Sequence, residues 1–326
     1  MQDSHGRTID YIRISVTDQC NLRCVYCMPH ENTGLSACQL KIEELELLCS
    51  CFSELGIQNI KITGGEPLMR KDVAEIICRI KKISGIRNVT LTTNGVLLAE
   101  KIGKLRAAGL DAVNISMDSL NAAEYEEISQ RNMLGKTLEG LEAALACPGL
   151  SVKINCVPIK GMNDSQIVPM AALARDRNLH VRFIEMMPIG YGKNFAFQGE
   201  EEIKNRLERE LGICLIPYEG RLGHGPSHYY TAEGFRGKIG FISAVTHKFC
   251  SDCNRVRLTS DGFLKTCLQY NIGCDLKTLL KKNAPKEQLL VAIRESIYNK
   301  PLCHHFEQPE KDPQMEEQRG MSQIGG

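Results

Sequence analysis

Residues 9–27 read IDYIRISVTDQCNLRCVYC, a β-rich run that leads directly into three cysteines. Cys20, Cys24 and Cys27 follow the spacing C-x3-C-x2-C, whereas a closed structural metal site normally has four protein ligands. Soft thiolates at such spacing favour zinc or an iron–sulfur cluster. Three thiolates on a four-iron cluster would leave one iron open to a small molecule. Half of a zinc ribbon, or three thiols crowded in a loop, would give the same spacing.

The run at 9–16 is the first of six strand candidates, and the others are 57–63, 88–93, 112–118, 151–159 and 180–187. Between them lie helical patterns, several of which close on Gly or Asn. This alternation predicts an α/β fold with a parallel sheet of right-handed units, and we expect a partial (β/α)6 barrel. In barrels, function gathers at the carboxyl ends of the strands. A doubly wound open sheet has the same periodicity and remains an alternative.

The rhythm breaks after Pro188, so we divide the chain into a barrel at 1–188 and a C-terminal domain at 189–303. Residues 304–326 are polar and poor in large apolar side chains, and we expect a weakly packed, flexible tail. That tail ends in Gly325-Gly326.

Composition places few limits on the partner. The 326 residues hold 40 Lys+Arg and 39 Asp+Glu, so a net charge of +1 gives no argument for nucleic acid or an anionic membrane. No apolar leader or membrane span is evident, which predicts a cytoplasmic protein. Fifteen cysteines then indicate metal binding or buried thiols rather than disulfides. We expect most of nine scattered cysteines to be core residues: Cys38, Cys49, Cys51, Cys78, Cys147, Cys156, Cys214, Cys274 and Cys303.

The first cysteine group, with Tyr26 before its third cysteine and TGGEP at 63–67, resembles the radical S-adenosylmethionine (SAM) enzymes. The resemblance implies a [4Fe-4S] cluster whose open iron binds SAM, and cleavage of SAM to a 5'-deoxyadenosyl radical. It also implies SAM contacts at Tyr26, Gly65, Ser116 and Met187. Ser116 and Met187 have a plainer interpretation as packing at strand ends. Glycine at Gly65 would let the backbone approach the ligand closely.

A second cysteine group lies at 250–267, CSDCNRVRLTSDGFLKTC, where Cys250, Cys253 and Cys267 have the spacing C-x2-C-x13-C. Spacing alone favours a structural zinc site with His247 or Cys274 as fourth ligand. The stretch CNRVRLTSDGFLKTCL, however, is similar to the C-terminal cluster region of the GTP 3',8-cyclase family of molybdenum cofactor biosynthesis. That resemblance implies a second [4Fe-4S] cluster in the C-terminal extension, with an open iron that meets the guanine of GTP.

Several cations interrupt strands that otherwise look buried. Arg13, Lys61 and Lys153 lie amid apolar residues of the first, second and fifth strands. A buried charge is costly unless it is paired, so phosphate binding would explain all three. A salt bridge or an exposed strand face would explain any one of them. Arg255 and Arg257 alternate beside the second cysteine group and could face one pocket.

The cyclase resemblance implies GTP contacts at Arg13, Lys61, Thr92, Lys153, Arg255, Val256, Arg257, Gly325 and Gly326, and catalytic roles for Cys20, Cys24, Cys27, Arg255 and Arg257. Many family members have Arg where this chain has Lys61, which keeps the charge but loses the bidentate fork. The implied reaction is cyclisation of GTP to (8S)-3',8-cyclo-7,8-dihydroguanosine 5'-triphosphate. The implied partners are a flavodoxin- or ferredoxin-like electron donor, a downstream cyclic pyranopterin monophosphate synthase and a second copy of the chain in a homodimer.

Other functions fit parts of the pattern. A different two-cluster radical SAM enzyme, such as a peptide maturase, would share both cysteine groups, although it would not require the set of strand cations. A zinc-stabilised binding module would need no chemistry at all. The terminal Gly-Gly is also found in ubiquitin-like sulfur carriers, but those are small β-grasp domains. By itself the terminal pair would be a frayed end.

Overall fold

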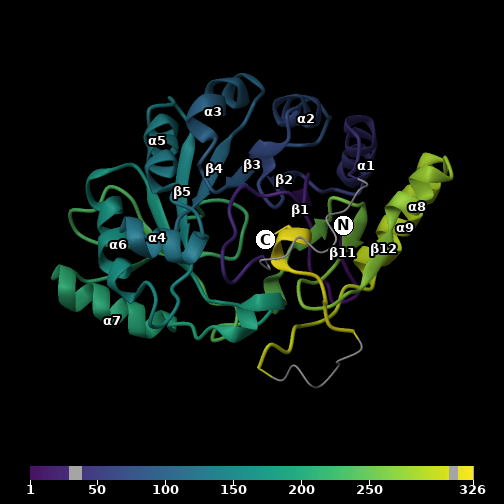
Figure 1. Ribbon diagram of the computed structural model, residues 1–326. Coiled ribbons are helices and arrows are strands. Elements are labelled where there is room, and N and C mark those ends of the chain that lie inside the picture. Colours follow the sequence, from purple (N-terminus) through teal and green to yellow (C-terminus); the bar gives the residue numbers. More distant parts are fainter. Residues whose placement is uncertain (29–38, 308–314, 326) are drawn as a thin grey trace.

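The computed structural model describes residues 1–28, 39–307 and 315–325 (Figure 1). All six predicted strands are present: β1 Tyr11–Ser15, β2 Asn59–Thr63, β3 Asn88–Thr93, β4 Ala112–Ser116, β5 Ser151–Cys156 and β6 His180–Ile184. The helices between them are α1 Ile42–Glu54, α2 Val73–Lys81, α3 Leu98–Ala107, α4 Ala122–Ser129, α5 Leu134–Leu145 and α6 Ile167–Asp176. The α/β class predicted from the sequence is therefore confirmed.

Strand order separates the two topologies that periodicity left open. Strands β1 to β6 lie side by side in sequence order, and each pairs in parallel with the next. A doubly wound sheet would reverse direction at a switch point, and no reversal occurs here. The sheet bends round an interior while the helices cover its outer face (Figure 1). Its ends do not pair with each other within the described residues, so the barrel is partial.

The C-terminal region completes this same sheet. Strand β10 (Arg255–Leu258) pairs in parallel with β1, and β9 (Ile239–Ile242) pairs in parallel with β6. Short antiparallel strands then end the sheet on each side: β11 Phe263–Lys265 and β12 Gly273–Asp275 beyond β10, and β8 His228–Thr231 and β7 Ile216–Tyr218 beyond β9. The sheet order thus places the second cysteine group, which flanks β10, beside the first strand.

An apolar core fills the space between the outer face of the sheet and the helices that cover it. On β1, Ile12 and Ile14 have no exposed surface and belong to this core, whereas Arg13 between them faces the interior of the barrel. Alternation along a strand sends successive side chains to opposite faces. Helices α8 (Leu276–Lys281) and α9 (Lys286–Tyr298) extend the outer layer next to α1, and α7 (Glu200–Leu211) packs on α6 (Figure 1).

Three strands end earlier than the sequence predicts. Beyond their ends, carboxylate side chains accept hydrogen bonds from backbone amides that would otherwise continue the strand pairing. The predicted strands at 112–118 and 151–159 stop at Ser116 and Cys156, and beyond them the Asp118 carboxylate accepts the Val157 amide at 2.8 Å. Similarly β6 ends at Ile184, and the Glu185 carboxylate accepts the amides of Val245 and Thr246. The barrel strands therefore end in polar turns that open toward the interior.

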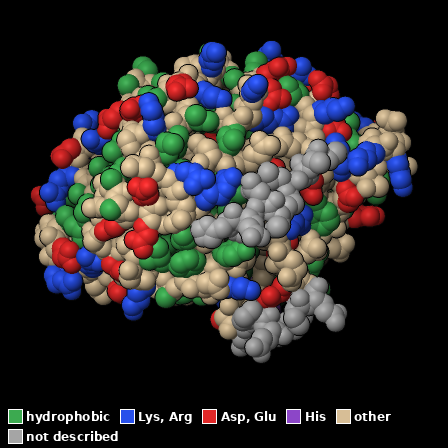
Figure 2. Space-filling model, in the orientation of Figure 1, with side chains coloured by type: hydrophobic (Ala, Val, Ile, Leu, Met, Phe, Trp, Pro, Cys, Tyr) green, Lys and Arg blue, Asp and Glu red, His purple; other side chains and the backbone are tan. Residues whose placement is uncertain are grey.

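The scattered cysteines follow the prediction in part. Cys49, Cys51 and Cys156 are buried, but Cys214 is exposed because it lies in the polar connection after α7. Cys38 lies outside the described residues. Basic and acidic side chains are interspersed over the face shown in Figure 2, which fits the net charge near zero. None of the described helices is long and apolar enough to cross a bilayer.

The TGGEP turn after β2 fixes the loop that carries the first cysteine group. The Gly65 amide donates to the Thr17 carbonyl, and the Glu66 amide donates to the Gln19 carbonyl, each at 2.7 Å. A Cβ on Gly65 would lie 2.4 Å from the Gln19 oxygen, and one on Gly64 would lie 2.5 Å from the Thr17 oxygen. Both glycines are therefore required so that the turn can approach the segment just before Cys20.

We predict that Gly65→Ala lowers the free energy of unfolding of the apoprotein by about 1–3 kcal/mol, because backbone atoms cannot yield to the added methyl group. Urea unfolding measures this change. Gly103→Ala is the matched control, since a Cβ there meets nothing within 4 Å in the middle of α3. That helical position should gain up to about 1 kcal/mol. Equal stability of the two variants would contradict the proposed packing.

Candidate active site

The first cysteine group lies in the loop that follows β1. Cys20, Cys24 and Cys27 are half-buried and free of disulfides, and the Cys27 amide donates to the Cys24 carbonyl at 2.9 Å. Amide donors surround the sulfurs: the Leu22 amide lies 3.4 Å from the Cys20 sulfur, and Asn94 Nδ2 lies 3.8 Å from it. Hydrogen bonds of this kind to sulfur tune iron–sulfur clusters.

The electrostatics of these thiols fit a cationic occupant. Burial raises the pKa of Cys20 to about 11 and that of Cys27 to about 12. Burial raises the pKa of Cys24 as well, and the charges of Cys27, Asp118 and Cys20 add to the effect. Three thiolates held together in this way repel one another unless a metal compensates them. The residues present therefore fit the iron–sulfur cluster that the motif implies.

Tyr26 joins this loop to the end of β4. Its hydroxyl donates to the Asp118 carboxylate at 2.6 Å, and burial raises the pKa of Asp118 to about 6. Ser116, Tyr26 and Cys24 line one small cavity of about 40 Å³ beside the loop. The predicted SAM contacts Tyr26 and Ser116 thus lie together next to the first cysteine group. Met187 lines the cavity of the second group instead, so its SAM contact stays a prediction.

The second cysteine group surrounds a cavity of about 70 Å³ beside β10. Cys250, Cys253 and Cys267 all line it, although Cys267 comes from the far end of the β10–β11 hairpin. Burial opposes ionisation of Cys253, but the charges of Lys300 and Arg255 outweigh it and lower the pKa of that thiol to about 7. An ionised thiol at neutral pH is the form that binds a metal.

The two candidates for a fourth zinc ligand make contacts elsewhere. His247 Nδ1 lies 3.8 Å from the Glu200 carboxylate, and the Cys274 sulfur lies 3.7 Å from the Ala292 carbonyl. Neither side chain lines the cavity of the second cysteine group. In the part of the chain that the structure describes, no three His, Cys, Asp or Glu side chains are gathered so as to hold a single metal ion.

A row of cations crosses the barrel interior between the two groups. Parallel pairing places Arg13 of β1 directly beside Lys61 of β2 on one side and Arg257 of β10 on the other. Lys153 of β5 and Arg255 of β10 join Arg13 and Lys61 around one cavity of about 350 Å³. The strand cations singled out in the sequence therefore meet in a single interior.

No described carboxylate neutralises Lys61 or Lys153 by an ion pair. Burial lowers the pKa of Lys61 well below its usual value, and the charges of Arg182, Arg13 and Lys153 lower it further. Burial and the charge of Arg182 lower the pKa of Lys153 to about 8. The positive charges of Lys61, Lys153 and their arginine neighbours repel one another. A polyanion would stabilise them, so this interior is suited to phosphate groups.

Two other positions add to this interior. Thr92 is buried on β3, and its hydroxyl has no hydrogen-bond partner among the described residues, which leaves it available to a ligand. Arg182 of β6 lines the cation cavity, although the sequence analysis did not select it. Its Nε donates to Asn155 at 3.0 Å. The signal was the same as for Lys61 and Lys153, namely a cation inside an apolar strand.

Arg255 connects the two larger cavities, since it lines both the cation cavity and that of the second cysteine group. Its guanidinium lies over the Phe249 ring, 4.9 Å from the centroid. Val256 between the two arginines packs in the outer core with 1% exposure. A GTP contact at Val256 would therefore come from its backbone, and this contact stays a prediction.

The end of the chain enters the barrel at the cation row. The Gly325 carbonyl accepts hydrogen bonds from Arg257 and, at 3.3 Å, from Arg13. Gly325 has φ of +75°, and a Cβ there would lie 3.0 Å from Thr63 and 3.4 Å from Ser15. Only glycine fits this left-handed position between two strands. Gly326 lies outside the described residues.

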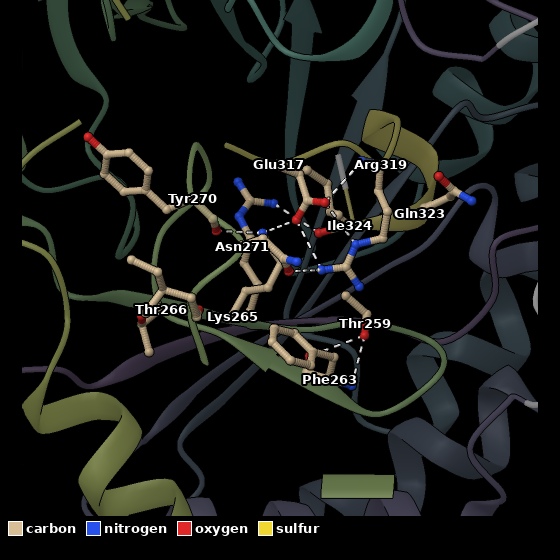
Figure 3. Close-up of polar contacts among 12 residues, drawn as sticks. Thr259, Phe263, Lys265, Thr266, Tyr270, Asn271, Glu317, Arg319, Gln323 and Ile324 are labelled. Carbon is tan, nitrogen blue, oxygen red and sulfur yellow. Dashed lines mark hydrogen bonds and ion pairs between the residues drawn. The ribbon is translucent and has the colours of Figure 1, made fainter. Parts of the chain in front are cut away.

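The segment leading to Gly325 is anchored, which differs from the weakly packed tail that the sequence predicts. Lys265 and Glu317 form an ion pair with 0% and 2% exposed side chains, and Arg319 donates to the same carboxylate at 2.9 Å (Figure 3). Lys265 also donates to the Tyr270 carbonyl at 2.7 Å. The polarity of the segment indicated weak packing, but Lys265, a buried residue of β11, supplies a partner for the Glu317 carboxylate.

The anchored segment also touches both cysteine groups. The Ser322 amide donates to the Cys27 thiol of the first group. Ile324 is fully buried in a small apolar cluster with Ala244 and Phe306, two residues that line the cavity of the second group. The segment that ends at Gly325 thus contacts the first cysteine group, the cation row and the lining of the second group's cavity.

The chain matches two family models and close relatives. The Radical SAM superfamily model matches residues 14–174, and the Molybdenum Cofactor Synthesis C model matches residues 179–306. A GTP 3',8-cyclase of Clostridium perfringens (strain 13 / Type A) is 40% identical over 328 residues, covering 100% of both chains. A GTP 3',8-cyclase of Syntrophomonas wolfei subsp. wolfei is 42% identical over 333 residues, again covering 100% of both.

Solved structures agree at the level of fold. The crystal structure of Streptococcus suis SuiB has a TM-score of 0.60 with 16% sequence identity, covering 91% of this chain and 68% of that one. SuiB bound to its precursor peptide SuiA has a TM-score of 0.59 with 14% identity, covering 90% and 66%. Such low identity shows a shared fold alone. Because relatives about 40% identical match it over its full length, the chain belongs to the GTP 3',8-cyclase family of radical SAM proteins.

Proposed function

We propose that this protein is a radical SAM enzyme that cyclises GTP to (8S)-3',8-cyclo-7,8-dihydroguanosine 5'-triphosphate, the first step of molybdenum cofactor biosynthesis. The observation that carries the proposal is the row of strand cations inside the barrel, which adjoins the second three-cysteine group and begins on β1, the strand that leads into the first. The phosphates of a nucleoside triphosphate can bind such a row of cations, and its base can reach the proposed metal site beside the row. The full-length match to GTP 3',8-cyclases supports the same substrate.

Each part of the site has a role in this proposal. Arg13, Lys61 and Lys153 hold the phosphates, and charge-assisted hydrogen bonds of this kind contribute about 1.5–3 kcal/mol each. The free hydroxyl of Thr92 binds a further polar group of the nucleotide. Arg255 lines both the cation cavity and the cavity of the second cysteine group, Arg257 lines the latter, and the two orient the nucleotide toward that group. No acid or base is required of these side chains.

When bound, a cluster at Cys20, Cys24 and Cys27 with SAM would supply a 5'-deoxyadenosyl radical able to take the hydrogen of ribose C3', and joining C3' to guanine C8 would then require one further electron and one proton from the electron donor and solvent. The protein positions the nucleotide and excludes water. Tyr26, Gly65, Ser116 and Met187 are the proposed SAM contacts. Cys250, Cys253 and Cys267 would hold the second [4Fe-4S] cluster at the guanine, and Gly325 and Gly326 are further proposed contacts of GTP.

The proposed partners follow from this chemistry. A flavodoxin- or ferredoxin-like protein would supply electrons, and a cyclic pyranopterin monophosphate synthase would consume the product. A homodimer is a further expectation. The peptide maturase alternative gains no support from the likeness to SuiB, because structures with 14–16% identity show a shared fold and carry no substrate information.

The direct test is formation of 5'-deoxyadenosine by the reconstituted, oxygen-free protein with SAM and a strong reductant. We predict that GTP raises the yield and that the nucleotide product converts to a cyclised pterin precursor. Cleavage of SAM that ignores GTP would retain the radical SAM chemistry but refute the substrate. Purification with zinc and without iron or sulfide would refute the radical chemistry itself.

Affinity for GTP should fall as pH rises above about 8. In the free protein Lys153 has a pKa of about 8, and bound phosphate favours its charged form and raises that pKa. Binding therefore takes up a proton above this pH, which weakens affinity by up to about tenfold per pH unit. Lys153→Arg keeps its charge and should flatten the dependence, measured by equilibrium binding without reductant. The same slope in both proteins would exclude Lys153 as its source.

We predict that Glu317→Gln releases the chain end, because it leaves the Lys265 ammonium buried without a compensating charge. Removing one partner of such a pair costs about 3–5 kcal/mol. Limited proteolysis should then cut after residue 307 several-fold faster, and binding of GTP should weaken. Glu316→Gln is the matched control, since Glu316 is only half-buried and contacts Gln269 at 3.4 Å. Equal proteolysis of the two variants would show that the ion pair does not hold the segment.

A further inference from the structure

A fourth cysteine lines the cavity of the second group. Cys303 lies there together with Cys250, Cys253 and Cys267, although 36 residues separate it from the last of them in sequence. Four cysteines of the C-terminal region therefore surround one cavity.

The segment that carries Cys303 is held firmly against Cys250. Arg7 is 7% exposed, and its guanidinium donates to the carbonyls of Cys250 at 2.9 Å, Pro301 at 2.7 Å and Leu302 at 2.7 Å. A 2.6 Å ion pair with buried Asp3 fixes the guanidinium in turn. One arginine thus ties the residues just before Cys303 to the first cysteine of the second group.

Two further contacts bind the same segment to the cavity. Buried Lys300 donates to the carbonyl of Thr266, the residue before Cys267. The His304 amide, next to Cys303, donates to the Cys250 sulfur. The backbone on both sides of Cys303 is therefore pinned to two of the three cysteines.

The buried His304 side chain adds polar ring nitrogens to the lining of this cavity. It is 6% exposed, it lines the cavity, and neither ring nitrogen has a hydrogen-bond partner in the described part of the chain, although the Ala244 backbone lies near the ring. The ring stacks on Phe306, with centroids 4.2 Å apart. A buried polar group without a partner costs stability and indicates a missing occupant.

We infer that Cys303 is a fourth ligand of the second iron–sulfur cluster when no nucleotide is bound, and that the nucleotide base displaces it. The inference rests on the proposed function, which places a cluster at Cys250, Cys253 and Cys267. Four thiolates are the ordinary ligand set of a [4Fe-4S] cluster. A closed ligand set protects the metal until substrate arrives.

The exchange needs no redox partner. The bond between iron and the Cys303 sulfur breaks, a purine nitrogen or oxygen takes that position, and the released thiolate takes a proton from solvent. A place for the released thiol exists, since the Cys303 sulfur lies 3.8 Å from Nε2 of His305. The oxidation state of the cluster is unchanged.

The test is alkylation of the oxygen-free holoprotein with iodoacetamide, followed by mass spectrometry of the Cys303 peptide. We expect Cys303 to be protected without nucleotide and to react several-fold faster when GTP is added. If GTP merely covered the cavity, it would slow this reaction instead. Exposed Cys214 is the internal reference and should react equally in both states. If Cys303 reacts equally fast in the nucleotide-free holoprotein and the apoprotein, the inference is overturned.

A second measurement separates this inference from the proposed function. The holoprotein should carry about eight irons per chain for two clusters. About four irons would overturn the second cluster and the inference together. With eight present, Cys303→Ala should change the electron paramagnetic resonance spectrum of the reduced protein without GTP, and GTP should make the variant and wild-type spectra coincide. Cys274→Ala is the control, and unchanged spectra in both variants would overturn the role of Cys303 alone.

Discussion

Mutual repulsion among cations inside the barrel is the constraint on which the rest of the site depends. Register places the partly exposed Arg13 between buried Lys61 and the partly exposed Arg257 on three neighbouring strands, and a charge that is removed from water costs several kcal/mol unless it is compensated. The protein retains them because a continuous apolar layer on the outer face stabilises the sheet independently. These like charges repel one another, and a polyanion would compensate them. In the described structure, the Gly325 carbonyl supplies part of that compensation through its dipole.

The same arrangement would allow two cysteine groups far apart in sequence to serve the one reaction that we propose. Strand β10 pairs with β1, so the C-terminal cysteines lie on one side of the cation row and the Cys20–Cys27 loop follows β1 on the other. A triphosphate held between them leaves its sugar and base to span the gap. The C-terminal segment, fixed by Lys265 and Glu317, contacts Cys27 of the first group and packs on Ala244 and Phe306, which line the cavity of the second.

Much of this could be predicted from the sequence, because its signals are local. The cysteine spacings, the GGEP turn and cations inside strands such as IKIT and VKIN each identify residues that the structure brings together. Arg182 carried the same local signal and was missed. The packing of Gly65 against Gln19, the anchor of Glu317 and the approach of Cys303 depend on contacts between distant segments. Polarity of residues 304–326 even suggested the opposite, because the buried partner of Glu317 lies more than fifty residues earlier in the chain.

The central claim is that the cation row places the ribose of GTP against the first cysteine group while the base faces the second. Incubation with GTP deuterated at ribose C3' tests it most directly. The account predicts that deuterium appears in the 5'-deoxyadenosine that is formed. Formation of GTP-dependent 5'-deoxyadenosine without deuterium would show that another atom of the nucleotide faces the radical, and would contradict the proposed orientation.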